Sequence, residues 1–259
     1  MMTMILIGAA AVCGLMLILW LIHLPIRNAA IVDAGWAGGL ALLAVIYGVL
    51  GDGWMPRRVV IGAMVLYWGF RLGLFLLLTR VIGHPEEGRY VELRRKWGSN
   101  IALKFFAFFE VQALLDVVLS APFLLAALDP KPHFTALEIA GVATWLLAFV
   151  GEIVADAQLR HFKMNSSNRG KSCQVGLWHY SRHPNYFFEF LIWVGYALYA
   201  LDAPYGFVGL LSPALILYFL LRLSGIPATE AQALRSRGDE YRAYQRTTSA
   251  FVPWFPKRG

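Results

Sequence analysis

Residues Gly176 to Glu189 read GLWHYSRHPNYFFE and lead straight into an apolar run. Pro184 fits the first turn of a helix, where its missing N–H costs nothing. Asn185 and Glu189 are four residues apart, so they share one face of that helix. A Glu about one turn inside a membrane-length helix is expensive unless it has a partner or a function. This stretch therefore predicts a functional site where a membrane helix begins.

The composition of the rest of the chain is that of a polytopic membrane protein. Of the 259 residues, 58% are apolar and only 15% are charged, against about 25% charged in an average soluble domain. Seven apolar windows approach the roughly 20 residues that cross a bilayer; they lie at about 3–22, 35–50, 59–79, 102–128, 135–158, 186–202 and 205–223. We expect an all-α polytopic membrane protein with seven transmembrane helices, in a single integral-membrane domain over residues 1–259.

The distribution of the 23 Lys and Arg residues predicts the orientation of the chain. If the N-terminus lies outside, the inner segments carry 18 of them: Arg27, five from Arg80 to Lys96, five from Arg160 to Arg182, and seven from Arg222 to Arg258. The outer segments carry only Arg57, Arg58 and Lys131. We therefore expect the N-terminus outside and the C-terminus in the cytoplasm. The inner excess of cations fits the topology signal alone, and it also fits an anionic cofactor on that side.

Several common kinds of site are absent from the sequence. Cys13 and Cys173 fall in a span and in an inner loop, so neither a disulfide framework nor a CxxC pair is expected. Neither a GxGxxG after a strand nor a GxxxxGK[ST] loop is present. The histidines His161, His179 and His183 lack the spacing and the Cys partners of a zinc site, so we expect no metal.

Polar residues at helical spacing point to a cofactor instead. Glu152, Asp156 and Arg160 recur every fourth residue and form a stripe on one helix face. A basic loop containing Lys163 and Lys171 follows. Cationic side chains suit phosphate and pyrophosphate groups, while Asn and carboxylate side chains suit amide, amino and hydroxyl groups. The pattern predicts a large polar cofactor with phosphate and ring groups.

The first half of the chain contains polar residues in or near its spans, and two of them, Asp33 and Arg71, have two open interpretations. Asp33 lies at or just inside the boundary of the second span, either as a helix cap or as a functional carboxyl. Tyr67 and Arg71 are one turn apart and so face the same way. Arg71 either extends toward the inner interface or faces the interior of the bundle.

The opening stretch, written as Gly176-Leu177-Trp178-x-Tyr180-Ser181-Arg182-His183-Pro184-Asn185-Tyr186-x-x-Glu189, resembles the signature of the membrane-embedded steroid 5α-reductase family, which includes many bacterial proteins. The similarity covers essentially the whole chain. It extends to Val32-Asp33-x-x-Trp36, Trp68-Gly69-Phe70-Arg71, Gly151-Glu152-Ile153-x-Ala155-Asp156-x-Gln158, Ser224-Gly225-Ile226-Pro227 and Tyr241-x-x-Tyr244-x-x-Thr247.

The resemblance implies NADPH-dependent reduction of the Δ4 double bond of a 3-oxo-Δ4-steroid or a similar lipid enone, by hydride transfer to the β-carbon. A donor aimed at the carbonyl oxygen would stabilise the charge that develops there, and the resemblance makes Asp33 and Tyr67 the candidates. Asp33 has to carry a proton to donate. The human enzymes have a Glu and a Tyr in these roles, so Asp33 is one methylene shorter, and Trp68 competes with Tyr67 for the matching position.

The remaining site residues follow from the same resemblance. It implies that residues 1–128 mainly form the substrate pocket, with Trp36 and Trp68 contacting a steroid-like lipid that enters from the membrane, and that residues 151–259 mainly hold NADPH. The cofactor positions are Arg71, Asp156, Arg160, Lys163, Arg182, His183, Asn185, Tyr186, Glu189 and Tyr244. Glu152 stands where relatives carry Asn. We expect a monomer in a bacterial inner membrane, with its cofactor site facing the cytoplasm and no nucleic-acid partner.

A different enzyme class shares part of this pattern. Isoprenylcysteine carboxyl methyltransferases, phospholipid N-methyltransferases and sterol C14 reductases are similar in the Arg-His-Pro block and in the tail. A methyltransferase using S-adenosylmethionine would not need a carboxyl donor such as Asp33. A scaffold or sterol-binding protein without catalysis is expected to lose Asn185 or Glu189, and both are present.

Overall fold

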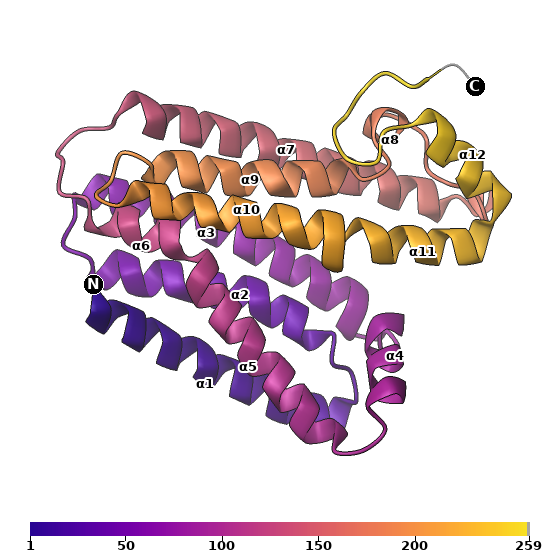
Figure 1. Cartoon of the computed structure of the whole chain (residues 1–259), viewed down its shortest axis with the longest axis horizontal. Coiled ribbons are helices and arrows are strands. Elements are labelled where there is room, and N and C mark those ends of the chain that lie inside the picture. Colours follow the sequence, from indigo (N-terminus) through magenta and orange to yellow (C-terminus); the bar gives the residue numbers. More distant parts are fainter. Residues whose placement is uncertain (258–259) are drawn as a thin grey trace. The chain divides into compact units, whose positions relative to one another are not determined.

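The computed structural model describes residues 1–257, which form helices joined by mostly short connections (Figure 1). Within these residues no β-strand forms, and β-pairing is confined to an isolated parallel bridge between Ser181 and Ser249. The chain divides into two compact units. The first comprises residues 1–135 and 200–209, and the second comprises residues 136–199 and 210–259.

The first unit is a bundle of long apolar helices with one short polar helix. Its elements are α1 (Met2–Ile26), α2 (Ile31–Leu50), α3 (Met55–Leu76), a π-helical turn (Leu77–Val81), α4 (Gly88–Trp97), α5 (Ile101–Leu119) and α6 (Ala121–Leu128). The helix α2 packs against α1, α3, α5 and α6. Pro122 stands in the first turn of α6, where a proline is tolerated, so the predicted span 102–128 is two helices that meet at Ser120.

A buried arginine fixes one end of this bundle. The Arg57 guanidinium, at the start of α3, donates to the carbonyl oxygens of Asp129 (2.8 Å), Lys131 (2.9 Å) and His133 (2.8 Å). It also lies 3.5 Å from the Asp129 carboxylate, and both side chains are almost fully buried. These bonds satisfy backbone carbonyls of the turn after α6 that have no helix partner.

The second unit contains α7 (Ala136–Met164), a 3₁₀ turn (Ser166–Asn168), α8 (Leu177–Tyr180), α9 (Pro184–Ala200), α10 (Leu211–Tyr218), a π-helical turn (Phe219–Leu223), α11 (Ile226–Arg237) and α12 (Asp239–Thr247). A further 3₁₀ segment, Gly206–Leu210, precedes α10. The sequence predicts a helix stop at Gly225 and Pro227. The structure shows a break at Ser224–Gly225, after which a new helix starts with Pro227 in its first turn.

Glycines allow α7 and α9 to lie in close contact. A Cβ at Gly141 would come within 2.7 Å of the Tyr199 backbone nitrogen and 2.8 Å of the Gly195 carbonyl oxygen. One end of the pair is closed by Gly151, where a Cβ would come within 2.4 Å of the Phe188 ring. Small residues of this kind let apolar helices approach backbone to backbone. Because Gly151 lies opposite Phe188, the neighbouring Asp156 and Asn185 are also held close together.

Within residues 1–257, six helical segments are long and apolar enough to cross a membrane: Met2–Ile26, Ile31–Leu50, Met55–Val81, Ile101–Leu128, Ala136–Met164 and Gly206–Arg237. An all-helical membrane architecture is thus confirmed. The predicted span 186–202 corresponds to α9, whose 17 residues fall just short of that set. Seven spans and the sidedness of the termini stay predictions.

Candidate functional site

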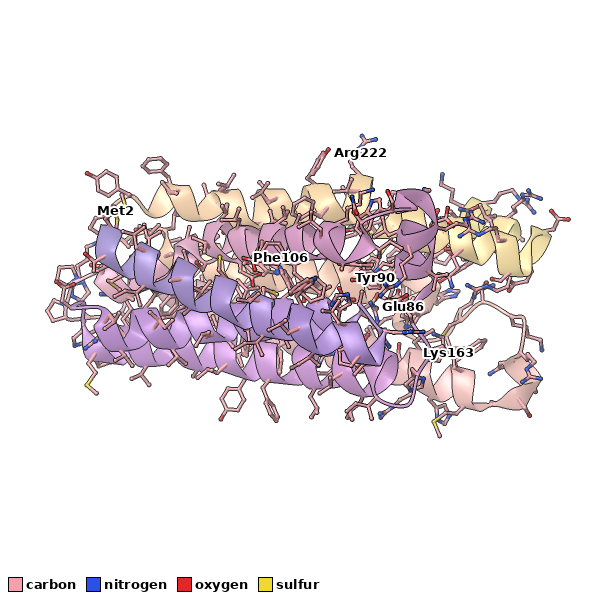
Figure 2. The ribbon with its side chains drawn as sticks, turned by 90° about the horizontal axis from the view of Figure 1, so that it is seen from below. Met2, Glu86, Tyr90, Phe106, Lys163 and Arg222 are labelled. Carbon is pink, nitrogen blue, oxygen red and sulfur yellow. The ribbon has the colours of Figure 1, made fainter. Side chains whose placement is uncertain are left out.

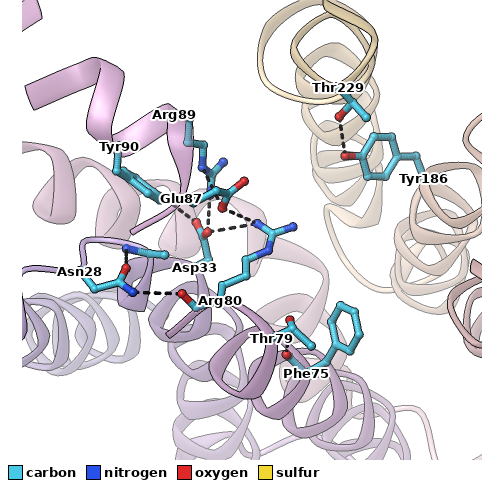
Figure 3. Close-up of polar contacts among 11 residues, drawn as sticks. Asn28, Asp33, Phe75, Thr79, Arg80, Glu87, Arg89, Tyr90, Tyr186 and Thr229 are labelled. Atoms are coloured by element: carbon cyan, nitrogen blue, oxygen red, sulfur yellow. Dashed lines mark hydrogen bonds and ion pairs between the residues drawn. The ribbon is translucent and has the colours of Figure 1, made fainter. Parts of the chain in front are cut away.

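In the first unit, Asp33 is the centre of a polar cluster between α2 and the residues around α4 (Figure 3). Its Oδ2 is paired with the guanidinium groups of Arg89 and, at 3.4 Å, Arg80. Its Oδ1 accepts a 2.7 Å hydrogen bond from the Tyr90 hydroxyl, and that hydroxyl accepts one of 2.7 Å from Arg89. Arg80 also donates to Glu87 at 3.1 Å. We call these five residues the Asp33 cluster.

The contacts of Asp33 bear on the two roles that were open for it, helix cap and functional carboxyl. The helix α2 is capped by Ala30, and Asp33 lies in the first turn, so it is not the cap. Both carboxylate oxygens act as acceptors, whereas the expected carbonyl donor needs a proton on one of them. Burial, together with Asp33, raises the pKa of Tyr90 well above 10, so the phenol keeps its proton at neutral pH. Tyr90 is therefore a neutral donor in this cluster, and its single hydroxyl hydrogen points at Asp33.

Further hydrogen bonds hold residues 80–86 to the residues just before α2. The Asn28 side chain donates to the carbonyl oxygens of Arg80 and His84, and the Ala29 amide donates to Glu86 at 2.8 Å. Arg94 binds Glu86 through two bonds of 2.7 and 3.0 Å. Figure 2 shows Glu86 and Tyr90 at the same end of this helical bundle. The π-helical turn that ends α3 carries Arg80.

The aromatic residues of α2 and α3 separate into buried and exposed positions. Trp68 is fully buried and lies edge-on against Trp36, with ring centroids 5.6 Å apart. Tyr67 is 69% exposed, so its hydroxyl does not point into the packed interior of its unit. Arg71, one turn further along α3, is partly buried. The structure thus pairs Trp36 with Trp68 and leaves Tyr67 apart from the Asp33 cluster.

In the second unit, the polar stripe of α7 meets the start of α9. The Asn185 amide donates to Asp156 at 3.3 Å, and the Asn185 oxygen accepts from the Tyr186 backbone N–H at 3.0 Å. Glu189, one turn further, accepts a 2.8 Å bond from the Trp193 indole. Glu152 is buried, and Arg160, at the other end of the stripe, is exposed. The predicted stripe therefore faces α9 over its first turns.

The Arg-His pair of the opening stretch contacts α11 and α12. Arg182 binds the Glu230 carboxylate through Nε and a terminal nitrogen, both at 2.7 Å, and His183 Nε2 lies 3.3 Å from it. The Tyr241 hydroxyl donates to the same Glu230 oxygen at 3.4 Å, and Gln245 donates to the other one at 2.7 Å. Arg182 also donates to the backbone carbonyls of Gln245 and Thr248. We call this group the Glu230 clamp.

Two expected cofactor tyrosines make contacts within the same unit. The Tyr186 ring stacks on His183 with centroids 5.4 Å apart, and its hydroxyl lies 3.1 Å from Thr229 Oγ1 (Figure 3). Tyr244 is buried, and its hydroxyl donates to the carbonyl oxygens of Trp178 and Ser181. Burial raises the pKa of Tyr244, so it acts as a neutral donor. Its bonds fix α12 against α8.

The docking of α8 depends on one glycine. Gly176 has φ +57°, and a Cβ there would come within 2.4 Å of the Gln158 side chain. Gln158 in turn accepts a 2.9 Å bond from the Leu177 amide, and the Trp178 indole donates to the Ala155 carbonyl at 2.9 Å. The start of the opening stretch is thereby attached to α7.

A cavity of about 650 Å³ lies where the end of α7, the following loop and the end of α11 meet. Lys163, Arg169, Lys171 and Arg237 line it, with Asn168 and Ser236 among its polar residues, and none of the described lining residues is an Asp or Glu. The loop is held in place by Ser172, whose amide and hydroxyl bind the Glu240 carboxylate at 2.8 and 2.6 Å. Four cations on one cavity favour an anionic ligand. Lys163 is labelled in Figure 2.

Comparison with known proteins places the chain in a family. Residues 19–248 match the family model described as "Protein of unknown function (DUF1295)". The chain belongs to the DUF1295 family. No curated protein and no solved structure is detectably similar to this DUF1295 protein.

Sequence reasoning missed several residues that the structure brings into these groups. The sequence assigns no role to Tyr90 or Glu230, and it places Arg89 and Arg237 only among the inner cations. The available signal was the density of charge in residues 80–97, which contain both Glu86-Glu87 and five cations. Such a balanced segment tends to pair internally or with a nearby charge, here Asp33. Among residues 1–257, no group of three or more metal-ligating side chains was found.

Proposed function

We propose that this DUF1295 protein is an NADPH-dependent membrane reductase that saturates the carbon–carbon double bond of a 3-oxo-Δ4-steroid or a similar lipid enone. The observation that carries the proposal is the cavity of about 650 Å³ with four cations, at the end of the helix that carries Asp156. Its volume lies in the range of ligand pockets. Its charge suits a cofactor that carries several phosphates.

The residues of the second unit fit such a cofactor. Lys163, Arg169, Lys171 and Arg237 would bind its phosphate groups, and the Asp156–Asn185 pair offers an acceptor and an amide to its polar rings or hydroxyls. When bound, NADPH would supply the hydride. The Glu230 clamp would act one step removed, because Arg182 and His183 are occupied by Glu230.

The Asp33 cluster would serve the substrate carbonyl. A developing oxyanion needs donors that are already oriented. Arg89 is held by Asp33 and has further N–H groups, whereas Tyr90 would have to turn its single hydroxyl hydrogen from Asp33 to the substrate oxygen. If Asp33 itself donates, it must be protonated and release one of these bonds. Asp33 and Tyr67 stay the candidates from the resemblance, and Tyr90 joins them on the geometry.

The charge of the cavity also favours a reductase over the methyltransferase alternative. S-adenosylmethionine carries a positive sulfonium and no phosphate, so a wall of Lys163, Arg169, Lys171 and Arg237 repels it rather than binds it. NADPH is negatively charged through its phosphates, so the same four cations attract it.

The decisive experiment incubates the purified protein with progesterone or testosterone and NADPH, NADH or S-adenosylmethionine. We expect NADPH oxidation with appearance of the saturated ketone. Lys171→Gln should raise the KM for NADPH and leave that for the steroid unchanged, whereas Arg222→Gln, an exposed cation outside the cavity lining, should alter neither. A methylated lipid would overturn the proposal. A D33N variant with full turnover would remove Asp33 from the mechanism.

We also propose that α9 is the seventh span, with the N-terminus outside and the C-terminus inside a bacterial inner membrane. Six spans would put both termini on one side, so α9 decides whether they lie on opposite sides of the membrane. Its 17 residues reach roughly 26 Å at ~1.5 Å per residue, near the lower limit for a span. Gly141 and Gly151 of α7 contact it from Tyr199 to Phe188, so it runs beside a longer apolar helix over most of its length. A C-terminal reporter that is active only outside the cytoplasm would test this, and it should be silent.

A further inference from the structure

The segment after α12 contains a second cavity that neither the proposed reaction nor the cofactor uses. Its volume is about 430 Å³, and residues between Gln245 and Lys257 line it. Arg246 and Lys257 supply two cations, Thr247 and Ser249 supply hydroxyls, and Trp254 and Phe255 supply aromatic surface. None of the described residues lining it is acidic. We call this cavity with its six named residues the tail site.

Hydrogen bonds to other segments hold the residues of the tail site in place. The Lys257 amide donates to the Thr247 carbonyl at 2.8 Å, and the Trp254 amide donates to the Tyr180 carbonyl at 2.9 Å. The Ser181 hydroxyl donates to the Phe251 carbonyl at 2.8 Å. These bonds attach the segment at three places to residues before α9 and at the end of α12.

Phe251 shows which part of α9 the tail lies against. Its ring contacts those of Phe187 and Phe190, at centroid distances of 5.6 and 5.9 Å, in the first two turns of α9. The sequence of α9 changes from polar to apolar over the same two turns. The tail therefore packs against the first two turns of α9, where that helix changes from polar to apolar. In a membrane helix such a change marks the level of the lipid headgroups.

The exposed side chains of the tail suit that level. Trp254 is 69% exposed and Phe255 74%, and the Phe255 ring lies 6.0 Å from that of Tyr180. Exposed aromatic rings next to cations are costly in water but typical of membrane interfaces, where the rings sit among headgroups and the cations bind phosphate. Neither the Arg246 nor the Lys257 side chain makes an ion pair within residues 1–257.

We propose that the tail site binds the phosphate headgroup of an anionic phospholipid. Arg246 and Lys257 contact the phosphate, Thr247 and Ser249 donate hydrogen bonds to it, and Trp254 and Phe255 lie among the neighbouring headgroups. The lipid would hold α12, and through it the Glu230 clamp, at the membrane surface. This inference is independent of the proposed reaction, because it uses neither the cofactor cavity nor the Asp33 cluster.

The test uses the full-length protein in nanodiscs of phosphatidylcholine alone or mixed with phosphatidylglycerol. Hydrogen exchange of the amides from Thr247 to Lys257 should be slower in the anionic discs. An R246Q/K257Q double variant should lose this difference and bind phosphatidylglycerol roughly 30-fold more weakly, since each cation near an anionic surface contributes about fivefold. W254A should also weaken binding, and W254F should restore most of it.

The matched control is R235Q/R242Q, which removes the same charge from exposed positions on α11 and α12 outside the tail site. It should keep the protection. Equal exchange of the wild-type tail in both kinds of disc would overturn the proposal, as would equal loss in the control, which would indicate a general charge effect. If millimolar inorganic phosphate protects the tail in phosphatidylcholine discs, a soluble anion is the ligand and the lipid assignment is wrong.

Discussion

Removing the Glu230 carboxylate should loosen the C-terminal helices from the start of α9. In the Glu230 clamp, Arg182 and Glu230 are 9% and 15% exposed at their side chains, so their interaction is largely protected from solvent. A Glu230→Ala variant would leave the Arg182 guanidinium without its main anion. Breaking a buried pair in this way costs about 3–5 kcal/mol. The residual exposure places Glu230→Ala near the lower end, at about 3 kcal/mol.

A Glu230→Gln variant should cost less, because it preserves volume and one acceptor. The two bonds from Arg182 at 2.7 Å would then go to a neutral amide oxygen instead of a carboxylate, which loses roughly 1–2 kcal/mol. For a chain of this size each kcal/mol corresponds to ~2–4 °C in melting temperature. We expect falls of about 10 °C for Glu230→Ala and about 4 °C for Glu230→Gln.

The assay is thermal unfolding of the detergent-solubilised full chain, with hydrogen exchange of α11 and α12 as a local readout. The control is Glu92→Ala, since Glu92 forms exposed pairs with Arg95 and Lys96, which are worth about 0–1 kcal/mol. Combining Glu230→Ala with Arg182→Ala should cost less than the sum of the two. If Glu230→Ala melts no lower than Glu92→Ala, or if the two clamp variants are additive, the clamp does not exist in solution.

Three further variants test other contacts. Arg57→Met should lower stability by about 3–5 kcal/mol in thermal unfolding, because it removes a buried cation that binds three carbonyls and faces Asp129; a loss under 1 kcal/mol would contradict this. Gly141→Ala should cost about 1–3 kcal/mol, while Gly38→Ala, whose Cβ meets nothing within 4 Å, should be neutral or stabilising; equal effects would exclude close α7–α9 packing. Burial and the nearby Glu230 raise the pKa of Tyr241 to about 12, so its contribution to stability is complete below pH 10 and is lost as the pH rises toward 12; Tyr241→Phe should flatten the decline of melting temperature in that window, and parallel curves would refute it.

The long helices of this protein could be predicted from the sequence, because a run of apolar residues near membrane length has few alternatives. Each of the seven predicted windows corresponds to helical structure. Their interruptions were harder to see. Pro122 could have indicated the break at Ser120, but the π-helical turns at Leu77–Val81 and Phe219–Leu223 contain no Gly or Pro. The first of these turns carries Arg80, which pairs with Asp33 of α2.

The partners of the charged residues could not be predicted, for a related physical reason. Helical spacing places Asp156 and Arg160 on one face, but it does not indicate which residues of another helix will meet them. Asp33 was expected to donate as a protonated carboxyl. In the structure it pairs with the guanidinium groups of Arg80 and Arg89, which follow it in the chain by 47 and 56 positions. Pairs at that separation depend on how the loop folds back, which no local pattern encodes.

The Arg-His-Pro stretch illustrates how one motif can serve a site without touching its ligand. Asn185 contacts Asp156 of α7, and Glu189, one turn further along α9, binds the Trp193 indole. Arg182 and His183, just before that helix, turn to α11 and hold Glu230. The helix α11 ends at Arg237, which lines the cation-rich cavity. Loss of the clamp would therefore displace Arg237, one of the four cations of that cavity. Substitution of Arg182 should thus weaken the binding of an anionic cofactor, although Arg182 itself does not line the cavity.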